Sequence, residues 1–190
     1  MSSEPPKTHA DPGSPASAWV CRWAACLPRG ARVLDFACGG GRNAAPLLAA
    51  GARVVGADAD ADALARLPGG VERVHADLES AAWPFAPAAF DAIVCCNYLF
   101  RPRLDLLFGL VAPGGLVIYE TFARGNERYG RPSNPKFLLV PGELVRTAER
   151  NGFTVLAYEH AHVAQPRPAR VQRLAAARPP FDAERFAPVG

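Results

Sequence analysis

The sequence has little lysine, no strong charge of either sign and no long apolar run. Only two of its 21 basic residues are lysine, and 18 acidic residues leave a formal net charge of +3. Binding to nucleic acid needs clustered cations, so this balance gives little support for that function. No run approaches the ~18 apolar residues of a membrane helix, and the N-terminus lacks the apolar core of a signal peptide. We therefore expect a cytoplasmic protein.

The sequence also lacks a Cys-x-x-Cys pair among its five cysteines, which are Cys21, Cys26, Cys38, Cys95 and Cys96. An odd number with this spacing suits neither a disulfide framework nor a zinc site, so we expect reduced, mostly buried thiols and no metal. Hydrophobic residues make up 49% of the chain and charged residues 21%, which excludes a wholly disordered chain, collagen and a coiled coil. A length of 190 residues fits one domain with a sizeable core.

Along the chain, strand and helix patterns alternate after a proline-rich start. We expect a flexible N-terminal arm at residues 1–16, one domain at 17–178, and a C-terminal tail at 179–190 that either dangles or docks. Strand patterns lie at residues 31–36, 53–57, 71–75, 90–96, 116–119, 153–159 and 171–177, and helix patterns at 18–27, 42–50, 61–67, 104–110 and 144–151.

This alternation predicts an α/β fold with a doubly wound, mostly parallel sheet covered by helices on both faces. The connection between the last two strands is too short for a crossover helix, so those strands should be antiparallel. Glycines and prolines interrupt residues 122–142, which we expect to form a long loop or lid; we call this stretch the lid segment.

A glycine turn follows the first strand. Gly39-x-Gly41-x-x-Ala44 formally matches the dinucleotide fingerprint, in which a pyrophosphate binds at the helix N-terminus. Asp35 would lie directly before this turn and repel a pyrophosphate. A carboxylate there instead suits S-adenosylmethionine, which carries an ammonium and a sulfonium group but no phosphate.

Further polar residues stand where the next strands end. Asp58 follows the second strand, 19 residues after Gly39, and an acid there can accept both ribose hydroxyl protons, although it can also cap a helix. Asp77 and Leu78 follow the third strand and can offer a carboxylate and an apolar face to an adenine. Residues 96–99 close the fourth strand. Open α/β sheets bind ligands at this edge, so these strand ends should converge on one crevice.

These residues resemble the class I S-adenosylmethionine-dependent methyltransferases, and most closely the small bacterial tellurite-resistance or thiopurine-type group. The resemblance is carried by residues 33–43 (Val-Leu-Asp-Phe-Ala-Cys-Gly-Gly-Gly-Arg-Asn), 54–58, Asp77-Leu78 and 90–96. It implies a Rossmann-like seven-stranded sheet of order 3-2-1-4-5-7-6 with strand 7 antiparallel. Ala37 replaces the family's usual first glycine, so the backbone there must tolerate a methyl group.

The resemblance also implies roles in binding S-adenosylmethionine and its product S-adenosylhomocysteine. The turn of Gly39 and Gly41 would approach the methionine part, Asp58 would hold the ribose, and Asp77 and Leu78 would hold the adenine. Asn97 would border the transferred methyl, and Arg22 would meet the methionine carboxylate. The other expected cofactor-binding residues are Asp35, Ala37, Cys38, Asn43 and Ala59.

Methyl transfer is an in-line displacement, and holding the two reactants at near-attack distance can supply most of the rate. Tyr98 and Glu120 are our catalytic candidates for orienting or deprotonating an acceptor. Tyr119 and His160 are weaker ones, because Tyr119 fits a core position and His160 a solvated one. Cys95 and Cys96 fit packing positions better than that of a nucleophile, since the cytosine carbon-5 enzymes have Pro where Val94 stands.

We predict a methyltransferase that acts on a small-molecule acceptor, as a monomer or a homodimer. Methylation of RNA or protein, an NAD(P)-dependent reductase and a non-catalytic cofactor-binding module remain alternatives. The cations of the lid segment either face an anionic substrate or form an ordinary solvated surface; they are Arg124, Arg128, Arg131 and Lys136.

Overall fold

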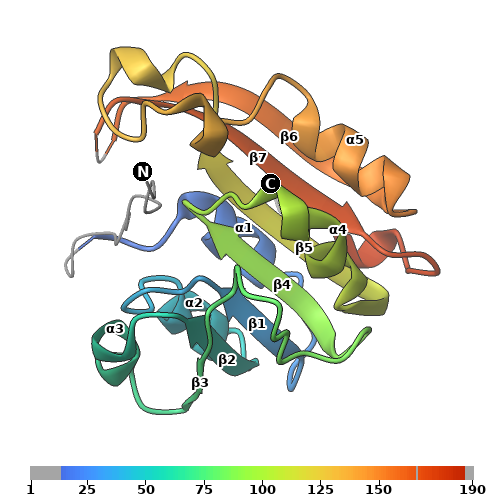
Figure 1. Cartoon of the computed structure of the whole chain (residues 1–190). Helices are drawn as coiled ribbons and strands as arrows, with labels where there is room; N and C mark the ends of the chain where they lie inside the picture. The colour runs from blue at the N-terminus through green and yellow to red at the C-terminus, as the bar shows by residue number, and fades with distance from the viewer. Residues whose placement is uncertain (1–13, 166, 187–190) are drawn as a thin grey trace.

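The computed structural model describes residues 14–165 and 167–186. Most of the expected N-terminal arm (1–13) and the end of the expected tail (187–190) therefore lie outside the described residues. A seven-stranded sheet with the order β3-β2-β1-β4-β5-β7-β6 forms the centre of the molecule (Figure 1). β7 is antiparallel to β5 and β6, and the other neighbouring pairs are parallel. The predicted strand order and the antiparallel strand 7 are confirmed.

The elements follow the predicted alternation closely. The strands are β1 (Arg32–Phe36), β2 (Arg53–Asp58), β3 (Val71–His75), β4 (Phe90–Cys96), β5 (Val111–Phe122), β6 (Thr154–Val163) and β7 (Ala169–Ala177). The α-helices are α1 (Ala18–Ala24), α2 (Ala44–Ala49), α3 (Ala61–Ala65), α4 (Leu104–Gly109) and α5 (Glu143–Arg150), with 3-10 turns η1 (Arg101–Arg103), η2 (Asn126–Arg128), η3 (Pro135–Phe137) and η4 (Glu184–Phe186).

Successive residues of the central strands enter two separate cores because side chains alternate across a sheet. In β1, Leu34 and Phe36 join the core that contains Phe108 of α4, whereas Val33 joins the core that contains Trp19 of α1. Both sheet faces are thus covered by helices, as the near-continuous apolar strands predicted.

The fifth strand begins earlier than expected. The sequence pattern predicted a strand at 116–119, but Pro113, Gly114 and Gly115 already lie within β5. This stretch is extended because the chain after β7 pairs with it: the Gly114 N–H donates to the carbonyl of Arg178 at 2.8 Å, and the Arg178 N–H donates to the carbonyl of Gly115 at 2.9 Å. A Cβ at Gly115 would lie 2.7 Å from the Asp91 carbonyl, so only glycine fits this approach.

The lid segment is held on several sides. The Arg101 guanidinium donates to the carbonyls of Lys136 and Leu138 at 2.7 and 2.8 Å, and it pairs with Glu143 at 2.6 Å. On the other side, the buried Asn126 accepts a hydrogen bond from the Arg170 N–H of β7 at 3.1 Å. The segment therefore packs against α5 and β7 as part of the domain.

The described part of the tail docks, which decides between the two outcomes that the sequence left open. Phe186 is buried in the core on the α1 side of the sheet. Arg185 donates to the carbonyl of Cys26 at 3.0 Å and to that of Gly114 at 3.3 Å. Residues 179–186 thus join the end of α1 to the start of β5.

Candidate functional site

The carboxyl ends of the parallel strands meet at one edge of the sheet, where the glycine turn follows β1 (Figure 1). Asp35 of β1 lies next to this turn, and its side chain is 2% exposed. Its Oδ2 atom is buried without a hydrogen-bond partner among the described residues. An unpartnered buried carboxylate oxygen is costly, so this atom is suited to a ligand that brings a donor or a positive charge.

Burial raises the pKa of Asp35 to about 7, while Arg42 opposes the shift and Asp58 adds to it. The carboxyl group is therefore poised to change its ionisation near neutral pH. A cation bound beside it would favour the ionised form.

Asp58 ends β2 and is 9% exposed. One of its carboxylate oxygens accepts the Gly39 N–H at 2.8 Å and the other accepts the Asp60 N–H at 2.9 Å. Each oxygen has a second lone pair, so the carboxylate can still accept two ligand hydroxyl protons. Asp58 thus ties the glycine turn to β2. Asp60, and not Asp58, caps α3 by accepting from the N–H groups of Asp62 and Ala63.

In the turn itself every second residue has a left-handed backbone, with φ of 55° at Ala37, 53° at Gly39 and 77° at Gly41. Ala37 tolerates the conformation that the family's glycine would adopt without strain, as the resemblance required. A Cβ at Gly41 would lie 2.3 Å from Leu67 Cδ2, so this glycine is needed for packing against the chain after α3. Burial, followed by the charges of Asp35 and Asp58, holds the pKa of the Cys38 thiol well above its usual range.

Asn43 lies at the start of α2 and is buried, but its side chain serves the fold. Its Oδ1 atom accepts the Ser17 N–H at 3.0 Å, and Arg42 donates to the Pro15 carbonyl at 3.3 Å. The chain that leads into α1 therefore crosses the glycine turn. Arg22 is exposed, and its guanidinium carbon lies 5.7 Å from the Trp19 ring centre and 5.5 Å from that of Trp23.

The residues predicted to hold an adenosine lie beyond β2 and β3. Asp77 is exposed and accepts the Glu79 N–H at 3.0 Å, whereas Leu78 is buried in the core. Ala59 is exposed, and its carbonyl lies 3.1 Å from His75 Nε2.

Asn97 and Tyr98 follow β4 at the same edge. Asn97 has a left-handed φ of 56°, and its N–H donates to the Glu120 carbonyl at 2.9 Å. The Tyr98 hydroxyl donates to Glu79 at 3.4 Å, and burial, followed by the charge of Glu79, holds its pKa well above the usual range. Tyr98 therefore keeps its proton and is suited to donate a hydrogen bond rather than to act as a base.

Glu120 is 8% exposed and forms the centre of a polar cluster that sequence reasoning found only in part. Arg173 of β7 pairs with Glu120 at 2.5 Å and with Glu159 of β6 at 3.1 Å. The strand registers place Cys96, Glu120, Arg173 and Glu159 directly opposite one another across β4, β5, β7 and β6. Arg173 was missed, although a charged residue inside the apolar run of β7 was a visible signal.

The two weaker catalytic candidates, Tyr119 and His160, do not lie in the candidate site. Tyr119 is fully buried, and its hydroxyl donates to the Tyr98 carbonyl at 2.8 Å, so it is a core residue. His160 is exposed on β6. Of the five thiols, which we expected to be mostly buried, Cys95 is fully buried, and burial raises its pKa to about 12. Cys26, Cys38 and Cys96 are half-buried, and Cys21 is exposed on α1.

Comparison with known proteins agrees with this geometry. Residues 33–115 match a family model described as a methyltransferase domain. A demethylmenaquinone methyltransferase from Clavibacter sepedonicus is 38% identical over 105 residues, which cover 50% of this chain and 42% of that protein. A ubiquinone biosynthesis O-methyltransferase from Aeromonas salmonicida is 27% identical over 167 residues, covering 71% and 68%.

Solved structures share the fold over most of the chain. An S-adenosylmethionine-dependent methyltransferase from Mesorhizobium loti superposes with a TM-score of 0.64 at 20% identity, over 83% of this chain and 98% of that one. TehB from Haemophilus influenzae gives 0.65 at 19% identity, over 82% and 60%. The chain has the fold of a class I methyltransferase. The family resemblance and fold class predicted from the sequence are thereby confirmed.

The chain spans less than half the length of the first two curated relatives, covering 42% and 45% of them. None of the helices in the described part of the chain is long and apolar enough to cross a membrane. Among the same residues, no three His, Cys, Asp or Glu side chains gather as a metal site would require.

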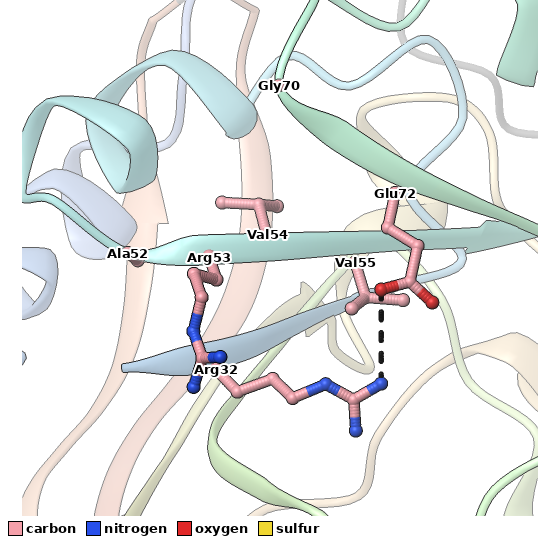
Figure 2. Close-up of a pocket in the computed structure, with 7 residues that line it drawn as sticks. All are labelled: Arg32, Ala52, Arg53, Val54, Val55, Gly70 and Glu72. Carbon is pink, nitrogen blue, oxygen red and sulfur yellow. Dashed lines mark ion pairs between the residues drawn. The ribbon is translucent and has the colours of Figure 1, made fainter. Parts of the chain in front are cut away.

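A cavity of about 290 Å³ lies at the opposite edge of the sheet, where β1, β2 and β3 begin (Figure 2). Arg32 and Glu72 form an ion pair of 4.0 Å across it, and the side chain of Arg53 lines it. Ligands of open α/β sheets bind at the carboxyl ends of the strands, so this cavity is not the candidate site.

Proposed function

We propose that the protein is an S-adenosylmethionine-dependent methyltransferase that acts on a small-molecule acceptor. S-adenosylmethionine supplies a methyl carbon bonded to a positively charged sulfur, which makes it reactive toward a lone pair. The observation that carries the proposal is the buried, unpartnered oxygen of Asp35 beside the glycine turn. A cationic cofactor satisfies this atom, whereas the pyrophosphate of a nicotinamide dinucleotide would be repelled by it.

The residues at the crevice fit this cofactor. Asp35 would face its positively charged methionine part, and Asp58 would accept the ribose hydroxyls with its remaining lone pairs. Leu78 would border the adenine from the core side, and Asn97 would border the transferred methyl. We take residues 17–178 as the catalytic domain, with the lid segment closing its acceptor side.

At the acceptor side, proximity supplies most of the catalysis, and the chain's own groups orient the nucleophile. Tyr98 donates a hydrogen bond, since it keeps its proton. Glu120 accepts one, and the ion pair with Arg173 holds its side chain in place. The curated relatives are named for demethylmenaquinone and for ubiquinone biosynthesis, which favours a small-molecule acceptor.

The decisive experiment is calorimetric titration of the purified protein with S-adenosylhomocysteine, S-adenosylmethionine and NADH. Binding of the first two and not of NADH supports the proposal. Binding of NADH alone would replace it with a reductase, and binding of none would favour a module without turnover.

Substitution of Asp58 by Ala tests the ribose assignment. We expect a loss of about 2 to 3 kcal/mol in the free energy of binding S-adenosylhomocysteine, because one partner of charge-assisted hydrogen bonds is removed. Calorimetry measures this loss. Asp62→Ala, at an exposed position on α3, is the matched control and should bind as the unmodified protein does. An unchanged dissociation constant in Asp58→Ala would contradict the assignment.

A further inference from the structure

Folding brings a cation of β7 beside three cations of the lid segment. Arg124, Arg128 and Arg131 come from the lid segment, and Arg170 comes from β7. The Ala123 N–H donates to the Arg170 carbonyl at 2.9 Å, beside the Asn126 contact described above, so the lid segment lies directly on the start of β7. Figure 1 shows this contact region on the same side of the molecule as the tips of β4 and β5.

The charge of this surface is only partly neutralised. Arg124, Arg128 and Arg131 are exposed, and within the described residues no ion pair joins them or Arg170 to a carboxylate. Glu127 is the acidic residue among them; it accepts the Gly125 N–H at 2.8 Å, and backbone hydrogen bonds, helped by the charges of Arg128 and Arg124, lower its pKa, so it offsets part of the positive charge.

An exposed aromatic ring lies within the cationic surface. Tyr129 is 44% exposed, and its ring centre lies 4.9 Å from that of His162 on β6, with 39° between the ring planes. His162 in turn is paired with Arg170 in the strand register. Contact with His162 fixes the orientation of Tyr129 and leaves much of the ring open to solvent. Such a ring among cations is the arrangement that unpaired bases and their phosphates recognise.

We propose that this surface, formed by Arg124, Arg128, Tyr129, Arg131, His162 and Arg170, binds single-stranded nucleic acid. Three of its cations are exposed along the lid segment and the half-buried Arg170 extends them onto β7, which suits an extended polyanion followed over several phosphates. A lipid membrane fits less well, because insertion needs apolar side chains and Tyr129 is the large exposed apolar residue of this face.

Arg170 lies three positions before Arg173 on β7, so the two side chains point to opposite faces of the sheet. The surface meets the candidate site through the lid segment, which continues directly from β5. The inference goes beyond the proposed function and does not depend on methyl transfer.

The test is fluorescence anisotropy of labelled RNA and DNA oligonucleotides of about 12 nucleotides with the full chain, at about 50 to 200 mM KCl. We expect binding that weakens with salt. Arg128→Glu/Arg131→Glu should weaken it on the order of tenfold and reduce the salt slope by about 1.4, the loss of two phosphate contacts. Tyr129→Ala should weaken it by about fivefold or more with the slope unchanged. Whichever of the RNA and DNA oligonucleotides binds more tightly shows whether the surface prefers ribose or deoxyribose.

The matched control is Arg29→Glu/Arg53→Glu, which makes the same charge change at exposed positions near the opposite edge of the sheet and should bind oligonucleotides nearly as the unmodified protein does. S-adenosylhomocysteine affinity, measured by calorimetry, should be the same in all variants, which separates this proposal from the proposed function. Absence of oligonucleotide binding at the lowest salt, or an equal loss in the control, would overturn the inference. So would binding to phosphatidylserine vesicles in place of oligonucleotides.

Discussion

At the residue scale, the side chains of the crevice serve the fold and the proposed cofactor to different degrees. Asn43 and Asp58 are engaged with backbone N–H groups of the chain, whereas Asp35 has a buried oxygen with no partner among the described residues. Removal of Asn43 or Asp58 therefore disturbs structure as well as binding. Asp35 is the position at which binding and stability oppose each other.

The raised pKa of Asp35 makes stability depend on pH. Its folded value of about 7 lies above the ordinary 3.8, so between these values the folded state binds more protons and stability falls as pH rises. The slope is at most about 1.4 kcal/mol per pH unit. Urea unfolding at about pH 5 and about pH 7.5 should show that the free energy of unfolding falls more between these two pH values in the unmodified protein than in Asp35→Asn.

Asp105→Asn serves as the control for this measurement. Asp105 is exposed and its pKa is lowered by Asn151 and Arg150, so its titration ends below the tested range and the slope should stay that of the unmodified protein. Equal slopes in the unmodified protein and Asp35→Asn would show that Asp35 is ionised throughout.

Ala37 carries a conformational cost that glycine would relieve. An alanine in the left-handed conformation is strained by roughly 1 to 2 kcal/mol, and glycine removes this strain. Glycine also makes the unfolded chain more flexible, which lowers stability by roughly 0.5 to 1 kcal/mol. Ala37→Gly should therefore raise the free energy of unfolding by up to about 1 kcal/mol in urea titration. Ala88→Gly, with a similar φ of 53° far from the turn in sequence, should behave alike. If Ala37→Gly lowers the free energy of unfolding instead, the contacts of the Ala37 methyl group stabilise the protein by more than its left-handed backbone costs.

At the element scale, Arg101 of η1 holds the lid segment to α5. Arg101→Ala should cost roughly 1 kcal/mol of stability, because the side chain is partly exposed, and should increase hydrogen exchange of the amides at 136–143. Exchange measured by mass spectrometry tests this effect. Arg150→Ala removes a more exposed pair with Asp105 and should leave exchange of the lid segment unchanged. Equal exchange in both variants would contradict a holding role for Arg101.

Sequence patterns located these elements because apolar runs and glycine turns act locally. Residues 90–96 were predicted as a strand and form β4 with the same bounds. Local patterns failed where distant chain decides the conformation: Gly114 and Gly115 are extended because Arg178 pairs with them. For the same reason the sequence indicated Asp35, Asp58 and Glu120 by their positions at strand ends, but did not reveal Arg173 or the surface around Tyr129.

At the scale of the whole molecule, the described part of the tail connects the two ends of the domain. Phe186→Ala should lower the free energy of unfolding by about 2 kcal/mol, the value of burying such a side chain, and lower the melting temperature by several degrees. Calorimetric melting measures the change. Phe186→Leu, which stays apolar, should retain most of the stability. Identical melting of Phe186→Ala and the unmodified protein would show that the docked tail contributes nothing.

The position of β7 has a consequence for synthesis on the ribosome. β7 lies between β5 and β6, and β6 has no other strand neighbour in the described sheet. Until residues 169–177 leave the exit tunnel, the edge of β5 is unpaired and β6 has no strand to join. The emerging chain therefore presents two open strand edges at once, a state in which aggregation competes with folding and in which a chaperone at the tunnel exit would have its greatest effect.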